Sequence, residues 1–134
     1  MTSHWRRLAA STEFAVLATI GPDGRPHLVP IVHAVVDDSV VFAVDRKPKT
    51  GRRLRRLENI AADPRVSILF EHRSGDWREL WWVRADGIAV EHDEPPSQAA
   101  VLHERHPAYG TEPPPGPWVL VTVERWRGWS AGEV

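Results

Sequence analysis

Three strand-like segments follow one another near the start of the chain, and only short turns separate them. Residues 14–20, 25–36 and 40–44 are rich in strand-forming side chains and lack the apolar spacing of a helix. Residues 21–24 (GPDG) and 37–39 (DDS) have the composition of turns. Because parallel neighbours need a crossover of roughly a dozen residues or more, these short turns predict antiparallel pairing. The pattern therefore argues against a doubly wound parallel sheet.

The rest of the chain predicts further strands and a few short helices. Leu54, Leu57 and Ile60 share one apolar helical face, and Asp63-Pro64 is expected to end that helix. More strands are expected at residues 66–71, 80–90 and 118–129, and more short helices near residues 5–9 and at 97–106, the latter closed by Pro107. Residues 1–134 contain no repeat and no linker, so we expect a single domain. Its class is mainly β, as a small antiparallel barrel with two to three short helices.

Two interruptions within the expected strands make local predictions. Pro30 has no backbone N–H to donate, so its strand should lie at a sheet edge, at a bulge or at a gap in the ladder. Asp86-Gly87 falls inside the expected fifth strand and predicts a β-bulge there. We interpret Asp86-Gly87, like Asp23-Gly24 in the first turn, as turn or bulge residues and not as catalytic acids.

Composition excludes several classes of site and location. The sequence has no cysteine, which excludes disulfides, thiolate zinc sites and a cysteine nucleophile. No apolar run approaches the ~20 residues that a membrane span requires. The first ten residues lack the apolar stretch of a secretory signal. We therefore expect a cytoplasmic protein with no membrane partner.

Positive charge gathers in one short segment. Seven of the 17 Lys and Arg residues lie within residues 46–56 (RKPKTGRRLRR), although the formal net charge is −1. The segment leads from a strand into the start of a helix, where backbone N–H groups favour anions. A phosphate held by Lys49 and one or two arginines would relieve the repulsion between like charges along the helix. A solvated basic face and a nucleic-acid site are the alternatives, and the latter usually needs a wider basic surface.

Four stretches of the sequence occur in a characteristic order and spacing. They are LATIGPDGRPHLVPI, RKPKTGRRLRRLENI, ADPRVSILFE and DWRELWWVRADG. Together they resemble the pyridoxamine 5′-phosphate oxidase-like split-barrel flavoproteins, and most nearly their actinobacterial branch of F420-dependent oxidoreductases. The resemblance runs from about residue 14 to the final RWRGW. It implies a six-stranded antiparallel split β-barrel, a homodimer, and a flavin or deazaflavin in a groove between the subunits.

The same resemblance implies a set of cofactor-binding residues. The segment after the third strand would hold the cofactor phosphate, although the choice between its arginines stays open. The second strand would run beneath the ring, and a tryptophan of the DW loop would cover the cofactor from the partner subunit. The residues implied in this way are His27, Pro30, Ile31, Val32, Lys47, Lys49, Arg53, Arg56 and Trp77.

The activity that the resemblance implies is hydride transfer between reduced F420 and a small organic substrate. It assigns no catalytic residue, because the cofactor supplies the chemistry. The chain is shorter than pyridoxamine phosphate oxidases and lacks their C-terminal substrate-phosphate arginine motif, which argues against vitamin B6 oxidation. FMN in place of F420, and a non-catalytic F420-binding or storage protein, are the alternatives. No nucleic-acid partner is expected.

Histidine spacing offers weaker hypotheses. His103 and His106 are three residues apart on an expected helix and could chelate a metal, but no third ligand is evident. The ordinary interpretation is two solvated histidines and no metal. His33 is expected to be a half-buried strand residue, with a role as proton donor as the alternative.

Tryptophan pairs predict which faces are buried. Trp81 and Trp82 should point to opposite faces of a regular strand, one into the core and one towards a dimer interface. Trp126 and Trp129 are expected to pack at the end of the barrel, with a place in the cofactor cleft as the alternative.

Overall fold

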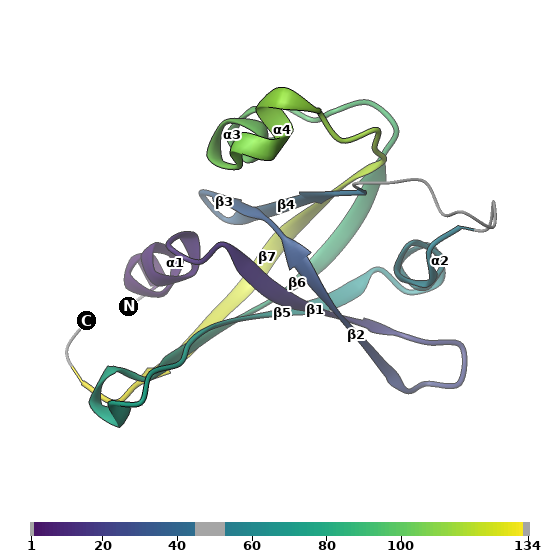
Figure 1. Cartoon of the computed structure of the whole chain (residues 1–134). Coiled ribbons are helices and arrows are strands. Elements are labelled where there is room, and N and C mark those ends of the chain that lie inside the picture. Colours follow the sequence, from purple (N-terminus) through teal and green to yellow (C-terminus); the bar gives the residue numbers. More distant parts are fainter. Residues whose placement is uncertain (1, 45–52, 133–134) are drawn as a thin grey trace.

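A curled antiparallel sheet dominates the fold (Figure 1). The computed structural model describes residues 2–44 and 53–132. Their seven strands form one sheet in the order β2-β1-β5-β6-β7-β4-β3, and every pairing between them is antiparallel. The strands are β1 (Phe14–Ile20), β2 (Pro26–Val32), β3 (Ala34–Val36), β4 (Ser39–Ala43), β5 (Arg65–His72), β6 (Trp81–His92) and β7 (Trp118–Ser130).

Short helices lie around this sheet. They are α1 (Thr2–Ala10), α2 (Arg55–Ala62), the 3₁₀ turn η1 (Trp77–Glu79), α3 (Ala99–Arg105) and α4 (Pro107–Thr111). Pro107 follows the end of α3, as expected, and it also occupies the first turn of α4, which the sequence did not predict. Within the two described ranges, no helix combines the length and the apolar composition of a membrane span.

The strand count differs from the expected six because the second expected strand is divided in two. The division falls at His33, where the chain stops pairing with β1 and begins to pair with β4. β2 and β3 lie at opposite ends of the strand order. The direct passage between them at one residue therefore requires the sheet to curl into a half-barrel.

Both expected interruptions are confirmed. Pro30 lies in the edge strand β2, opposite Val16 of β1. The ladder between β6 and β7 shifts its register between Asp86 and Gly87. A Cβ atom at Gly87 would lie 2.3 Å from the Thr122 carbonyl oxygen, so the close approach of β7 requires a glycine here.

The main core fills the concave side of the sheet. Its largest fully buried side chains alternate along the strands and include Leu17, Phe42, Ile68, Phe70 and Val83. A smaller cluster packs α3 and α4 against β3, β4 and the start of β7 through Ala34, Val41, Ala43, Ala99, Leu102, Tyr109 and Trp118. Val41 and Ala43 alternate with Val40 and Phe42 of the main core, so α3 and α4 cover the other face of the sheet at β4.

Candidate functional site

A groove lies where the ends of three strands meet the start of α2. The volume of this groove is ≈ 520 Å³. The residues that line it are Phe14, Pro30, Ile31, Val32, Ala43, Val44, Leu54 and Arg56. Seven of these eight side chains are apolar, so the groove suits a largely apolar ligand. We call it the Arg56 groove.

Four residues predicted from the sequence line this groove. Pro30, Ile31 and Val32 form the end of β2, and Arg56 belongs to the first turn of α2. Ile31 is buried and Pro30 is exposed, because successive side chains of a strand point to opposite faces. Arg56 is the one charged side chain among the lining residues in the part of the chain that the structure describes. The arrangement can therefore hold an apolar ring and an anionic group at once.

Arg53 lies close to the groove but does not line it. Its guanidinium donates to Glu91 at the end of β6, with 2.5 Å between NH2 and Oε1. The side chain of Glu91 is mostly buried and that of Arg53 is about half exposed. The pair therefore ties the start of α2 to β6. Between the two arginines that the sequence left open, Arg56 is the one that lines the groove.

The structure describes two of the other four predicted residues, and neither of these two lines the groove. Lys47 and Lys49 lie outside the described residues. His27 is half-buried near the start of β2, opposite Thr19, and does not line the groove. Trp77 lies on η1, and 77% of its surface is exposed. Its expected role, covering a cofactor bound to a partner subunit, stays a prediction.

A second hollow of ≈ 460 Å³ adjoins the Arg56 groove, because Phe14 and Pro30 line both. Its other walls come from residues 11–13, from residues 15 and 16 of β1, from the end of β5 with the following Arg73, and from Trp81. Sequence reasoning missed this hollow. Its charged side chains are Glu13, Glu71 and Arg73, of which the last two form an ion pair, and they gave no recognisable motif.

His33 is a structural residue and not a surface proton donor. It is fully buried, which is deeper than the sequence predicted, and its Nε2 lies 2.9 Å from the hydroxyl of Thr12. Burial, together with the nearby charges of Arg105 and His106, lowers the pKa of His33 to about 3. The ring is therefore neutral at physiological pH, which leaves it unsuited to deliver a proton to a substrate.

The two helix histidines also serve the fold. The prediction that both are solvated was wrong for His106, which is buried and donates from Nε2 to the backbone carbonyl of His33. The Nε2 atom of His103 accepts a hydrogen bond from the indole of Trp118. The described residues contain no group of three or more His, Asp or Glu side chains that could hold a metal.

The tryptophans divide largely as expected. Trp81 is buried in the core, whereas Trp82 points to the other face and is 36% exposed. Trp126 packs in the core and donates to Asp38, whereas Trp129 is 48% exposed. Core packing is thus confirmed for Trp81 and Trp126 and is wrong for Trp129.

Comparisons with known proteins agree with this architecture. The model of the pyridoxamine 5′-phosphate oxidase family matches residues 1–130. Among solved structures, a conserved hypothetical protein from Mycobacterium tuberculosis, Rv2991, is 26% identical with a TM-score of 0.75, and the match covers 98% of this chain and 85% of that one. No curated protein matches the sequence.

Two further structures share the fold at lower identity. An FAD-binding protein from Mesorhizobium loti is 18% identical with a TM-score of 0.72, covering 96% of this chain and 91% of that one. An FAD-binding protein from Mycobacterium smegmatis is 19% identical with a TM-score of 0.66, covering 96% and 93%. From the family match over nearly its whole length and from its curled antiparallel sheet, the chain belongs to the pyridoxamine 5′-phosphate oxidase family of split-barrel proteins.

Proposed function

We propose that this protein is an F420-dependent oxidoreductase that binds the deazaflavin in the Arg56 groove. The reaction is hydride transfer between reduced F420 and a small organic substrate. The observation that carries the proposal is the groove itself, in which the apolar end of β2 meets an arginine of α2. The basic segment of the sequence leads directly into that helix.

The residues of the groove fit a cofactor with a flat ring and a phosphate. A volume of ≈ 520 Å³ lies within the range of small-molecule sites. Ile31, Val32 and Leu54 offer apolar contact for a ring, and Arg56 offers donors for an anion. No side chain among the described residues caps the N-terminus of α2, where a phosphate is favoured.

The cofactor, when bound, supplies the hydride chemistry. The chain supplies binding and orientation. Arg56, together with Lys49 and Lys47 from the preceding segment, holds the anionic end, and the end of β2 fixes the plane of the ring. Arg53 has an indirect role, because its ion pair with Glu91 fixes the start of α2.

A second copy of the chain completes this site. Phe14 is 60% exposed and Leu28 is 63% exposed, both lie on the outer face of the β1–β2 hairpin, and Phe14 also lines the groove. Exposed apolar surface of this kind usually marks an interface. We assign it to a homodimer, in which Trp77 of one copy reaches the cofactor bound by the other.

Two alternatives stay within the same site. FMN in place of F420 is supported by the two similar structures that are named as FAD-binding proteins. A non-catalytic F420-binding or storage role is the second, because a binding groove does not establish turnover.

The test is a side-by-side titration of F420 and FMN, in which the fluorescence polarisation of the cofactor measures binding. We expect saturable F420 binding, and Arg56→Gln should weaken it about tenfold, because a charge-assisted hydrogen bond is lost. Arg25→Gln is the matched control, since Arg25 is 87% exposed in the β1–β2 turn and does not line the groove. It should leave the affinity unchanged.

Other outcomes separate the alternatives. Tight FMN binding without F420 binding would favour the flavin. Reduced F420 that binds but is not oxidised by any of a panel of acceptors would favour storage. Equal affinities for Arg56→Gln and the Arg25 control would remove the groove as the phosphate site.

A further inference from the structure

A second surface, remote from the lining of the Arg56 groove, combines aromatic and cationic side chains. It consists of Trp82, Arg84, Arg125, Arg127 and Trp129, on the outer face of β6 and β7. We call it the Trp–Arg face. None of its five residues lines the groove or the hollow beside it.

Strand register brings these side chains together. Trp82 pairs directly with Trp129, and Arg84 pairs with Arg127 in the next outward-facing row. Positions two apart on a strand are separated by roughly 7 Å, and neighbouring strands by about 4.8 Å. The two indoles are 36% and 48% exposed. One ligand of modest size can therefore touch an indole and a guanidinium at the same time.

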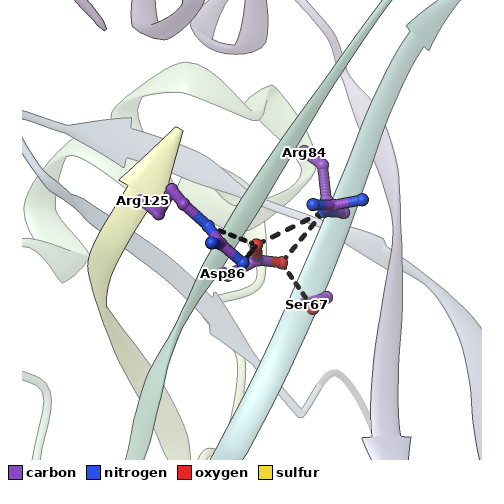
Figure 2. A network of polar contacts seen from close by, with 4 residues as sticks. All are labelled: Ser67, Arg84, Asp86 and Arg125. Atoms are coloured by element: carbon purple, nitrogen blue, oxygen red, sulfur yellow. Dashed lines mark hydrogen bonds and ion pairs between the residues drawn. The ribbon is translucent and has the colours of Figure 1, made fainter. Parts of the chain in front are cut away.

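A single carboxylate fixes two of the arginines, as Figure 2 shows. Asp86 accepts from Nε of Arg84 at 3.1 Å, from NH2 of Arg125 at 3.1 Å and from the hydroxyl of Ser67 at 2.7 Å. Each guanidinium keeps other N–H groups that this network does not use. The cationic heads are thus held in place before any ligand arrives.

The face keeps an excess of positive charge. Arg127 is exposed and makes no hydrogen bond or ion pair with residues 2–44 or 53–132. Asp86 balances one of the three arginines. Glu71, opposite Trp82, is paired with Arg73, and Glu124 precedes Arg125 at the bulge, so the three arginines still outnumber the carboxylates beside them. On a chain of net charge −1, this local excess favours an anion.

We propose that the Trp–Arg face binds a planar aromatic anion, separate from the cofactor. The ring of the ligand stacks on Trp129 and Trp82, and its carboxylate, sulfonate or phosphate receives hydrogen bonds from Arg127 and Arg84. The ring and the anionic group of the ligand must lie about as far apart as the Trp82–Trp129 pair and the Arg84–Arg127 pair. Arylalkyl carboxylates meet this requirement.

Pyrenebutyrate is a suitable probe, because it carries a flat ring and a carboxylate on a short chain. Its fluorescence anisotropy is measured during titration with the full-length protein in its native assembly. The wild type should bind it about tenfold more tightly than pyrenebutanol, which has the same ring without the charge. Arg127→Gln should weaken binding about tenfold, and Trp129→Leu about fivefold.

Arg25→Gln controls for loss of a surface charge and should bind as the wild type does. Circular dichroism checks that the variants are folded, and Arg127 has no described partner whose loss would unfold the chain.

Two outcomes of the titration overturn the proposal. One is equal affinity of the wild type for pyrenebutanol and pyrenebutyrate, and the other is unchanged pyrenebutyrate affinity in both Arg127→Gln and Trp129→Leu. Absence of binding by the wild type also overturns it, and would show that the face is covered. If Arg127→Gln leaves the affinity for F420 unchanged, the Trp–Arg face is a site separate from the proposed cofactor site.

Discussion

The two halves of the outer sheet face differ in chemistry although they belong to one sheet. The β1–β2 half presents apolar side chains, of which Phe14 and Leu28 are more than half exposed. The β6–β7 half presents the arginines and tryptophans of the Trp–Arg face. Both halves have the same alternation, with buried core residues beneath them. Alternation alone therefore does not tell what an outer face contacts.

This difference is the reason that we propose two kinds of partner. An apolar surface gains from burial against a similar surface, which suits a second copy of the chain. Arginines lose their hydration when buried and need anions in return, which suits a charged ligand. The β1–β2 half also borders the Arg56 groove, whereas the β6–β7 half does not.

The largest expected effect concerns the apolar half. Leu28→Asp places one carboxylate from each copy in the proposed dimer interface. Burial of the two charges costs roughly 4 kcal/mol or more, so the dimer should dissociate about a thousandfold more readily. Sedimentation equilibrium measures this. Val101→Asp, at another exposed apolar position on α3, is the control and should leave the assembly intact. A Leu28→Asp protein that associates like the control would place the interface elsewhere.

An intermediate effect is expected at the bulge that aligns the two strands of the charged half. Gly87→Ala forces a Cβ atom against the Thr122 carbonyl, and the free energy of unfolding should fall by about 2 kcal/mol. Gly75→Ala is the matched control, because its Cβ meets nothing within 4 Å. Urea denaturation compares the two. Equal stability would mean that β7 can move away from β6 without loss.

A smaller effect with a defined pH dependence is expected at Asp86. Partial burial raises the pKa of Asp86, but hydrogen bonds from Ser67, Arg125 and Arg84 outweigh it, so the pKa lies below its usual 3.8. A carboxyl with a lowered folded pKa stabilises the protein above its unfolded pKa and loses this effect as the pH falls further.

Asp86→Asn should therefore reduce the free energy of unfolding by about 1 kcal/mol at neutral pH, since solvent screens the exposed arginines. The gap between wild type and variant should close as the pH falls below 3.8. Urea denaturation at several pH values measures it. A gap that is constant with pH would show that the charge of Asp86 contributes nothing.

Local patterns predicted most of the elements but not their long-range contacts. The edge position of Pro30 and the bulge at Gly87 follow from what each residue does to its own backbone. The break at His33 does not, because it depends on Thr12 and on the passage between distant edges of the sheet. An extended segment that contains one histidine gives no local sign that the strand is divided there.

The candidate site shows the same limit. The end of β2 and Arg56 were predicted from the resemblance and they do line one groove. The partner of Arg53 is Glu91, which is 38 residues away in the chain, and charge composition alone could not assign that pair. The burial of His106 likewise depends on its bond to the backbone of His33.

Amide hydrogen exchange with and without F420 tests the central claim most directly. Slower exchange is predicted in peptides that contain the end of β2 and the first turn of α2, residues 28–32 and 53–58. Peptides from α3 and α4, which pack on another part of the sheet, should exchange unchanged. F420 binding that leaves residues 28–32 and 53–58 unprotected would contradict the assignment of the Arg56 groove as the cofactor site.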